Sequence, residues 1–279
     1  MESISDETRL GEMSIPGTHD TMTSHASQWV CSMYCHTQNM RLEEQLLKGI
    51  RFIDIRIAQE NRHDPFKIYH GPIHLQVSLR NVLDILKNFL ANHDKETVIM
   101  RWKREHGSYN LNDLKTVFED YKFEDGKHMI HDWGRTGPKP TTTPKLKDVR
   151  KQVVLITWDD DEKYFTNHRF PIQIEDNYGN IPWDRYCSFV EEGQGYFESL
   201  KQNMIRSQNS NNGNKFAVTF MSYAGGNPGT YLTCQSRLNT VMSEYLEKRF
   251  VKSKKGLGIV AMDYPETSEK IIRNIIYFN

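Results

Sequence analysis

LRNVLDILKNFLANHDKETVIMRW, residues 79–102, holds the two patterns from which the fold follows. In residues 79–93, leucine, valine and phenylalanine recur at intervals of three and four, which is the period of a helix with one apolar face. Residues 97–102 form a short apolar run rich in β-branched side chains, which is typical of a strand buried on both faces. The stretch therefore predicts a helix followed directly by a buried strand.

The same alternation continues along the chain. A chain in which strands alternate with helices folds as a parallel sheet covered by helices. At 279 residues, this favours one α/β domain over residues 1–279, with a closed or nearly closed (β/α) barrel of the TIM type as the first choice. An open, doubly wound sheet is the alternative. Further strands are expected at 51–57, 152–158, 216–222 and 257–264, and further helices at 40–49, 195–205 and 238–250.

Composition limits the classes of function. Lysine plus arginine and aspartate plus glutamate both number 36, so the net charge is zero, which argues against binding to nucleic acid. No apolar run approaches the roughly 18 residues of a membrane span. The first residues lack the pattern of a secretory signal, so the chain either stays inside the cell or is a mature or trimmed form.

The four cysteines leave two alternatives open. Cys31, Cys35, Cys187 and Cys234 are compatible with two disulfides and equally with reduced thiols. Cys31 and Cys35 with the adjacent His36 lack the second ligand pair of a zinc site, so no zinc is expected.

Titratable residues gather where the expected strands stop. Asp54 and Arg56 end the first strand, and the next short run ends with Tyr69-His70-Gly71. Lys103 directly follows the run at 97–102, and Asp263 closes the run at 257–264. In a parallel barrel, the chemistry lies at the carboxyl ends of the strands and in the loops after them. We therefore expect these side chains to share one face of the barrel.

The segment SIPGTHDT, residues 14–21, adds a second histidine motif. Its Pro-Gly pair predicts a turn, and turns are usually built from neutral polar residues. Here the turn is followed by His19 and Asp20, and histidine changes protonation near neutral pH. The pair is therefore a candidate for acid–base chemistry.

Taken in order, SIPGTHDT, GIRFIDIRI, YHGP, IEDNY and MDYP resemble the X domain of phosphatidylinositol-specific phospholipase C, in its metal-independent, bacterial-type branch. The resemblance runs from about Ser14 to Asp263. It implies a distorted, incompletely closed (β/α) barrel. It also implies cleavage of phosphatidylinositol by attack of the inositol 2-hydroxyl on the phosphate, which gives diacylglycerol and inositol 1,2-cyclic phosphate.

The resemblance also implies a role for each site residue. This chemistry needs a base for the 2-hydroxyl, an acid for the leaving alkoxide and a positive charge at the phosphate. His19 matches the base and Asp263 the carboxylate that orients it, while His70 matches the acid and Asp20 its support. Arg56 matches the phosphate clamp, for which a guanidinium is well shaped.

No metal or other cofactor is expected. In the metal-dependent branch, a calcium ion lies near the second strand, where Arg56 here would repel it. The positions that match inositol-ring contacts are Asp54, Lys103, Asp176 and Tyr178. At the position of the ring-binding arginine of the bacterial pattern stands Trp158, which leaves the headgroup preference open.

The implied partner is phosphatidylinositol, or a related inositol phospholipid, at a membrane surface, bound by a monomer. Trp29 in the segment 25–34 and Tyr231 in a glycine-rich loop at 224–232 match regions used for membrane contact. The implied location is secreted or peripheral to a membrane, with the cytoplasm as the alternative. Two other functions stay open: a metal-dependent glycerophosphodiesterase or sphingomyelinase D-like enzyme, and a catalytically inactive inositol-lipid-binding module.

Overall fold

The computed structural model describes residues 1–25, 35–61, 65–107, 109–132, 138–157, 170–175, 187, 190, 193–210, 213–222, 228–249 and 256–279.

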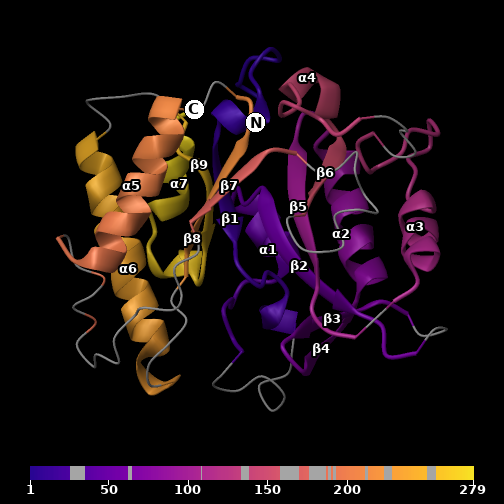
Figure 1. Ribbon diagram of the computed structural model, residues 1–279, viewed down its shortest axis with the longest axis horizontal. Helices are drawn as coiled ribbons and strands as arrows, with labels where there is room; N and C mark the ends of the chain where they lie inside the picture. The colour runs from indigo at the N-terminus through magenta and orange to yellow at the C-terminus, as the bar shows by residue number, and fades with distance from the viewer. Residues whose placement is uncertain are drawn as a thin grey trace.

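A curled sheet of nine strands forms the centre of the molecule (Figure 1). Seven strands run parallel in the order β7-β8-β9-β1-β2-β5-β6, and the hairpin β3-β4 pairs antiparallel with the end of β2. No pairing joins β6 to β7 among the described residues, so the barrel is incompletely closed there, as the sequence resemblance predicted. The strands are β1 (Ser14–Thr18), β2 (Phe52–Ala58), β3 (Lys67–His70), β4 (Ile73–Ser78), β5 (Thr97–Arg104), β6 (Gln152–Ile156), β7 (Ile172–Glu175), β8 (Phe216–Met221) and β9 (Gly258–Met262).

Helices cover the outer face of the sheet (Figure 1). In this view α5, α6 and α7 lie on one side and α2 and α3 on the other. The helices are α1 (Leu42–Leu47), α2 (Leu79–Asn92), α3 (Leu111–Glu119), α4 (Leu146–Val149), α5 (Gly195–Ser210), α6 (Pro228–Arg249) and α7 (Ile271–Ile276), with 3-10 turns at Leu10–Glu12, Thr23–His25 and Pro265–Thr267.

The two faces of the sheet carry two separate apolar clusters. Because successive strand residues point to opposite faces, Ile53 and Ile55 of β2 pack in the cluster shared with the helices. Phe52 is also on β2, which lies between β1 and β5 in the sheet. It packs in the second cluster, with Phe216 and Phe220 of β8. Toward the carboxyl end of β2, the residues that alternate with Ile53 and Ile55 become Asp54 and Arg56, so the inner face turns polar there.

The predicted strands and helices form within a few residues of their expected bounds, with two differences. The first concerns Pro16 and Gly17, which lie within β1 and not in a turn. All five residues of this strand are buried, and it pairs with β2 on one side and β9 on the other. A Cβ on Gly17 would lie 2.6 Å from the ring of Phe52, so glycine is required here by close packing and not by a turn.

The second difference concerns α6, which begins at Pro228 and not near residue 238. Proline is favoured at the first position of a helix because its missing N–H would have no partner there. The part of the expected glycine-rich loop from Pro228 to Leu232 is therefore the first turn of α6, and Tyr231 belongs to this helix.

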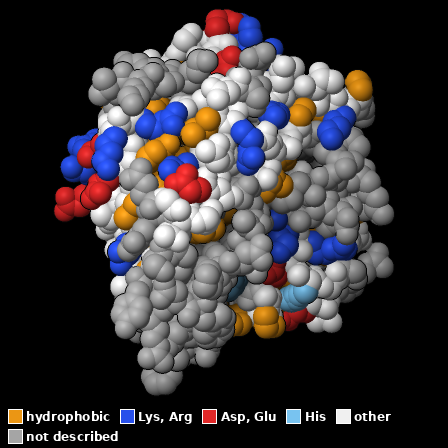
Figure 2. All heavy atoms as spheres, turned by 60° about the vertical axis from the view of Figure 1, so that its left-hand side comes forward, with side chains coloured by type: hydrophobic (Ala, Val, Ile, Leu, Met, Phe, Trp, Pro, Cys, Tyr) orange, Lys and Arg blue, Asp and Glu red, His pale blue; other side chains and the backbone are white. Residues whose placement is uncertain are grey.

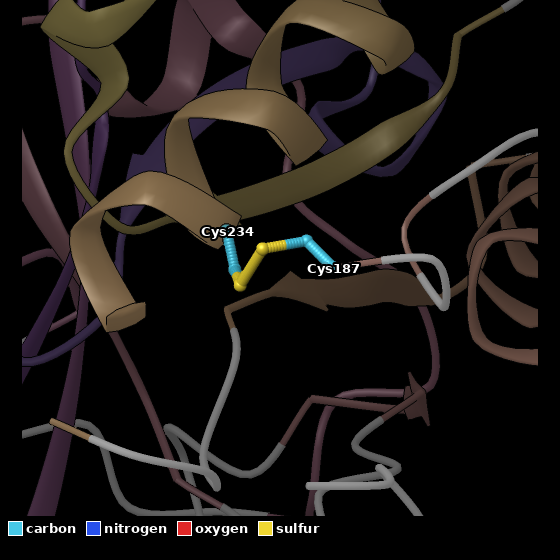
Figure 3. The surroundings of a disulfide bond; sticks show 2 residues. All are labelled: Cys187 and Cys234. Atoms are coloured by element: carbon cyan, nitrogen blue, oxygen red, sulfur yellow. A yellow bond between two sulfur atoms is a disulfide. The ribbon is translucent and has the colours of Figure 1, made fainter. Parts of the chain in front are cut away.

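A disulfide resolves part of the question that the cysteines left open. Cys187 and Cys234 are bonded, with Cα atoms 5.2 Å apart, and the bond ties α6 to Cys187 (Figure 3). Cys35 is also in a disulfide. Among the helices that the structure describes, none is both long and apolar enough to cross a membrane.

Candidate active site

His19 lies directly after β1, and its backbone is held from two sides. Its amide donates to the carbonyl of Met262 at the end of β9, at 3.0 Å. Its carbonyl accepts from the side chains of Gln38, at 2.8 Å, and Thr37, at 3.2 Å. Gln38 also donates to the carbonyl of Met262, at 2.9 Å, so it ties the ends of β1 and β9 together. These hydrogen bonds fix the main chain of His19, from which the imidazole extends.

The ring of His19 contacts a carboxylate from the far end of the chain. Its Nδ1 lies 3.0 Å from Oδ1 of Asp263, which follows β9 and is fully buried. The second oxygen of Asp263 accepts a hydrogen bond from the hydroxyl of Tyr231. When Nδ1 carries the proton that it donates to Asp263, Nε2 is left with a lone pair and can accept a proton.

Asp20 joins the two histidine motifs. Its Oδ2 lies 3.1 Å from Nε2 of His19 and 3.1 Å from Nε2 of His70, which ends β3. The two ring nitrogens can therefore be no farther apart than the sum of these two distances. His70 is the more exposed of the two, with 23% of its side chain accessible against 8% for His19.

Arg56 of β2 completes the group. Its Nε lies 2.5 Å from Oδ1 of Asp20, and its Nη2 lies 2.7 Å from Nε2 of His19. The guanidinium is 13% exposed, so it is buried enough for its charge to act strongly on its neighbours. A cation and two imidazoles thus surround a single carboxylate.

These contacts shift the titration of the buried groups. Burial lowers the pKa of His19, but the carboxylates of Asp20 and Asp263 outweigh burial, so its pKa lies above the ordinary value. Burial raises the pKa of Asp20, but Arg56, His19 and His70 together hold it well below the usual range of a carboxyl. Asp20 is therefore a permanent negative charge at neutral pH.

Asp54 lies beneath Arg56 and is 1% exposed. Its Oδ1 accepts from Nη1 of Arg101 at 3.0 Å, and its Oδ2 lies 3.4 Å from Nη2 of Arg56. Burial raises the pKa of Asp54, but Arg101 and Arg56 outweigh it and leave the pKa lowered. Two guanidinium groups thus engage this carboxylate, and its expected contact with an inositol ring stays a prediction.

Lys103 of β5 is 30% exposed, and its Nζ lies 3.0 Å from Oε2 of Glu105. The other oxygen of Glu105 accepts from the backbone amide of Gly71, at 2.7 Å, and lies 3.5 Å from Nη1 of Arg56. Gly71 follows His70 directly. Glu105 therefore links the strand that carries Arg56 to the turn that carries His70.

A cluster with the composition of a metal site is present. Ligand atoms of His19, Asp20 and Asp54 all lie within 4.8 Å of one another. Arg56, however, is in contact with all three, at 2.7, 2.5 and 3.4 Å respectively. A divalent ion bound by these atoms would face a fixed positive charge at hydrogen-bond distance, so the donor set does not fit a cation.

The expected residues thus divide into three groups. His19, Asp20, Arg56, His70 and Asp263 lie together, with Asp54 beneath them and Lys103 at the side, linked through Glu105. Tyr231 lies at the site, where its hydroxyl meets Asp263, and not at the tip of a loop. The remaining predicted residues lie outside the described residues: Trp29, Trp158, Asp176 and Tyr178.

Sequence reasoning missed three residues of this site, Gln38, Arg101 and Glu105, and it named Tyr231 only as a membrane contact. Arg101 could have been found, because it shares the inner face of β5 with Lys103, two residues on. The register of β2 and β5 places Arg101 opposite Asp54 and Lys103 opposite Arg56. Gln38 and Tyr231 carry no such pattern and depend on tertiary contacts.

Figure 2 shows histidine, acidic and basic side chains together in a hollow on one face of the molecule. The same view shows apolar side chains next to them.

Comparison with known proteins agrees with this arrangement. The family model "phosphatidylinositol-specific phospholipase C, X domain" matches residues 13–158. A 1-phosphatidylinositol phosphodiesterase of Listeria monocytogenes is 32% identical over 298 residues, which cover 100% of this chain and 84% of the relative. The corresponding enzyme of Staphylococcus aureus strain Newman is 24% identical, over 81% of this chain and 75% of the relative.

Solved structures show the same likeness. The phosphatidylinositol-specific phospholipase C of Listeria monocytogenes matches with a TM-score of 0.76 and 29% identity, over 100% of this chain and 97% of that chain. A mutant of the Staphylococcus aureus enzyme matches with a TM-score of 0.77 at 21% identity, which supports the fold. The fold and site define a barrel phosphodiesterase. The chain belongs to the family of the phosphatidylinositol-specific phospholipase C X domain.

Proposed function

We propose that the protein is a phosphatidylinositol-specific phospholipase C that cleaves the glycerol–phosphate bond of phosphatidylinositol. The inositol 2-hydroxyl attacks the phosphorus, the bond to the glycerol oxygen breaks, and the products are diacylglycerol and inositol 1,2-cyclic phosphate. One observation carries the proposal: Nε2 of His19 and Nε2 of His70 lie at the same 3.1 Å distance from Asp20, with Arg56 beside them.

His19 is the proposed base. With Nδ1–H donated to Asp263, its Nε2 is the atom that takes the proton of the 2-hydroxyl. The imidazolium that forms is stabilised by Asp263 on one side and Asp20 on the other. The raised pKa of His19 reflects the same two carboxylates, and it makes the ring a stronger base.

His70 is the proposed acid. It is more exposed than His19, which suits a group that must reach the glycerol oxygen of a lipid. Its Nε2 lies 3.1 Å from Oδ2 of Asp20, so the ring is held beside a carboxylate that stays ionised. Proton donation to the leaving alkoxide and proton removal by His19 thus occur on opposite sides of one phosphate.

Arg56 is the proposed phosphate clamp. A guanidinium offers several N–H groups in one plane, which matches the two free oxygens of a phosphodiester. Asp20 and Asp54 hold it from two sides, so little reorganisation is needed when charge builds up on the phosphate. In this proposal Asp54 positions Arg56, and Lys103, Asp176 and Tyr178 remain the proposed contacts of the inositol ring.

A phosphorus NMR assay tests the function. Phosphatidylinositol vesicles are incubated with the protein in excess chelator, and the spectrum is followed with time. We expect the lipid signal to be replaced by the signal of a five-membered cyclic phosphate, with no need for added calcium. Activity that requires a divalent ion would favour the glycerophosphodiesterase or sphingomyelinase D-like alternative, and binding without turnover would favour an inactive lipid-binding module.

The proposed setting is a membrane surface. The substrate is a bilayer lipid, so the protein is proposed to act as a monomer that is secreted or peripheral to a membrane, with no nucleic-acid partner and no cofactor. One domain over 1–279 is proposed to carry the activity. The sequence resemblance places Trp158 where the family has a ring-binding arginine, so a panel of headgroups is needed to define the substrate range.

A further inference from the structure

Helix α6 reaches the site through a tyrosine. The hydroxyl of Tyr231 donates to Oδ2 of Asp263, while Oδ1 of the same carboxylate meets Nδ1 of His19 at 3.0 Å. Asp263 is fully buried, so its charge receives no stabilisation from bulk water. The three side chains form a continuous chain of hydrogen bonds, Tyr231–Asp263–His19, in which each oxygen of the carboxylate has its own partner.

The helix that carries Tyr231 is anchored on the same face. Cys234, three residues on, is bonded to Cys187 (Figure 3). Asn239, which follows Tyr231 by about two turns, donates its amide to the main-chain carbonyl of Asp263 at 2.9 Å. The helix therefore holds both the main chain and the side chain of Asp263, and the tyrosine hydroxyl has little freedom to turn away.

We propose that Tyr231 is a positioning residue for the base: its hydroxyl keeps Asp263 ionised and turned toward His19, in the state that His19 needs in order to take the substrate's proton. The contribution to catalysis rests on the function proposed above, whereas the effect on His19 itself does not. Nothing in this role involves contact between Tyr231 and the lipid.

The direction of the effect follows from the coupled titration of the pair. The unprotonated pair, with neutral His19 and ionised Asp263, depends most on the tyrosine hydroxyl, because the carboxylate then has its full charge. When the pair holds one proton, on His19 or on Asp263, it has no net charge. Both of these states depend less on the tyrosine hydroxyl. Without the hydroxyl, deprotonation of the pair moves to higher pH, whichever residue holds the proton.

Among the residues that the structure describes, the other charged groups placed near His19 come from the loop after β1 and from β2, β3 and β5, and they are not part of α6. They are Asp20, Asp54, Arg56, His70 and Arg101.

The test compares Tyr231→Phe with the unchanged protein by NMR titration of the His19 ring and by the pH dependence of phosphatidylinositol cleavage. A hydrogen bond to a charged group is worth enough to move the titration of His19 up by about one pH unit. At neutral pH, kcat falls about tenfold, and the deficit shrinks as the pH rises. KM for vesicles stays the same.

Tyr121→Phe is the matched control. The Tyr121 hydroxyl donates to the carboxylate of Asp84 at 2.9 Å, so the same atom and the same kind of hydrogen bond are removed. Tyr121 follows α3 and is 6% exposed, and its partners lie on α2, away from His19. This variant is expected to lose stability while its His19 titration and its pH–rate profile stay unchanged.

The outcomes separate the ideas. A His19 titration that is the same in Tyr231→Phe and in the unchanged protein overturns the proposal. A fall in vesicle affinity with kcat and titration unchanged also overturns it, and makes Tyr231 a membrane contact. If the unchanged protein releases no cyclic phosphate, the proposed function fails, but the titration still decides the role of Tyr231.

Discussion

Nη2 of Arg56 lies 2.7 Å from Nε2 of His19. An arginine can only donate, so in the tautomer whose Nε2 accepts from Arg56 the ring proton lies on Nδ1, toward Asp263. A bound phosphate would draw the guanidinium to its own oxygens and free Nε2 for the substrate hydroxyl. The same contact therefore keeps the base in the right tautomer and marks where the phosphate binds.

The first prediction concerns the shape of the cation. Arg56→Lys keeps the charge but loses the planar fork, so a two-oxygen contact with phosphate is no longer possible. We expect kcat to fall by about 10²–10³, the usual effect of removing a group that stabilises transition-state charge. Arg80→Lys is the control, because Arg80 is half exposed and pairs only at the surface with Asp120. Equal turnover in Arg56→Lys and Arg80→Lys would remove the clamp from the mechanism.

The second prediction separates support of Arg56 from contact with the inositol ring. Asp54→Asn leaves the buried guanidinium groups of Arg101 and Arg56 without their shared counter-charge. Removing one partner of a buried ion pair costs about 3–5 kcal/mol in the free energy of unfolding, which urea denaturation measures. Unchanged stability together with weaker competition by free inositol would instead make Asp54 a ring contact.

The third prediction concerns pH. The pKa of His19 is raised in the folded protein, so the acidic limb of the kcat/KM profile is expected to have its midpoint above about 6.5, the ordinary histidine value. The same shift stabilises the fold fully below that ordinary value, and this contribution is lost as the pH rises through the folded pKa. An acidic limb with its midpoint below 6.5 would show that His19 is not the base.

The fourth prediction concerns the disulfide. Cys187 and Cys234 are 47 residues apart in sequence, so their bond closes a long loop in the unfolded chain. Replacing both with serine is expected to lower the free energy of unfolding by about 2–4 kcal/mol, which thermal or urea denaturation would reveal. The unchanged protein under strong reductant should lose at least as much stability, because the disulfide of Cys35 is reduced as well. No loss under either condition would mean that the Cys187–Cys234 bond is not formed in solution.

Much of the fold could be predicted because the strands and helices differ so clearly in period. The helix at Leu79–Asn92 and the strand at Thr97–Arg104 follow directly from the spacing of their apolar residues. The turn predicted from Pro16 and Gly17 was wrong. A turn preference is local, whereas β1 is fixed by its pairing with β2 and β9. The first turn of α6 was missed for a similar reason, since glycine and proline there resemble a loop.

The site could be predicted in part because its motifs lie at strand ends, where His19, Arg56, His70 and Asp263 were expected to meet. The supporting residues were harder to find. Tyr231 meets Asp263 only because α6 contacts the residues that follow β9, and nothing in the local sequence marks that contact. Asp54 was predicted as a site residue, but its partner Arg101 was not, because their ion pair depends on the register between β2 and β5.

The account depends most on the division of labour between the two histidines, and a change of leaving group tests it most directly. In a p-nitrophenyl ester of inositol phosphate, the leaving group needs no proton, so an acid is dispensable there while the base is still required. With phosphatidylinositol, we expect His19→Ala and His70→Ala each to lose about 10²–10⁴ in kcat. With the nitrophenyl ester, His70→Ala should recover most of its deficit and His19→Ala should not. Equal deficits for both variants on both substrates would contradict the assignment of base and acid.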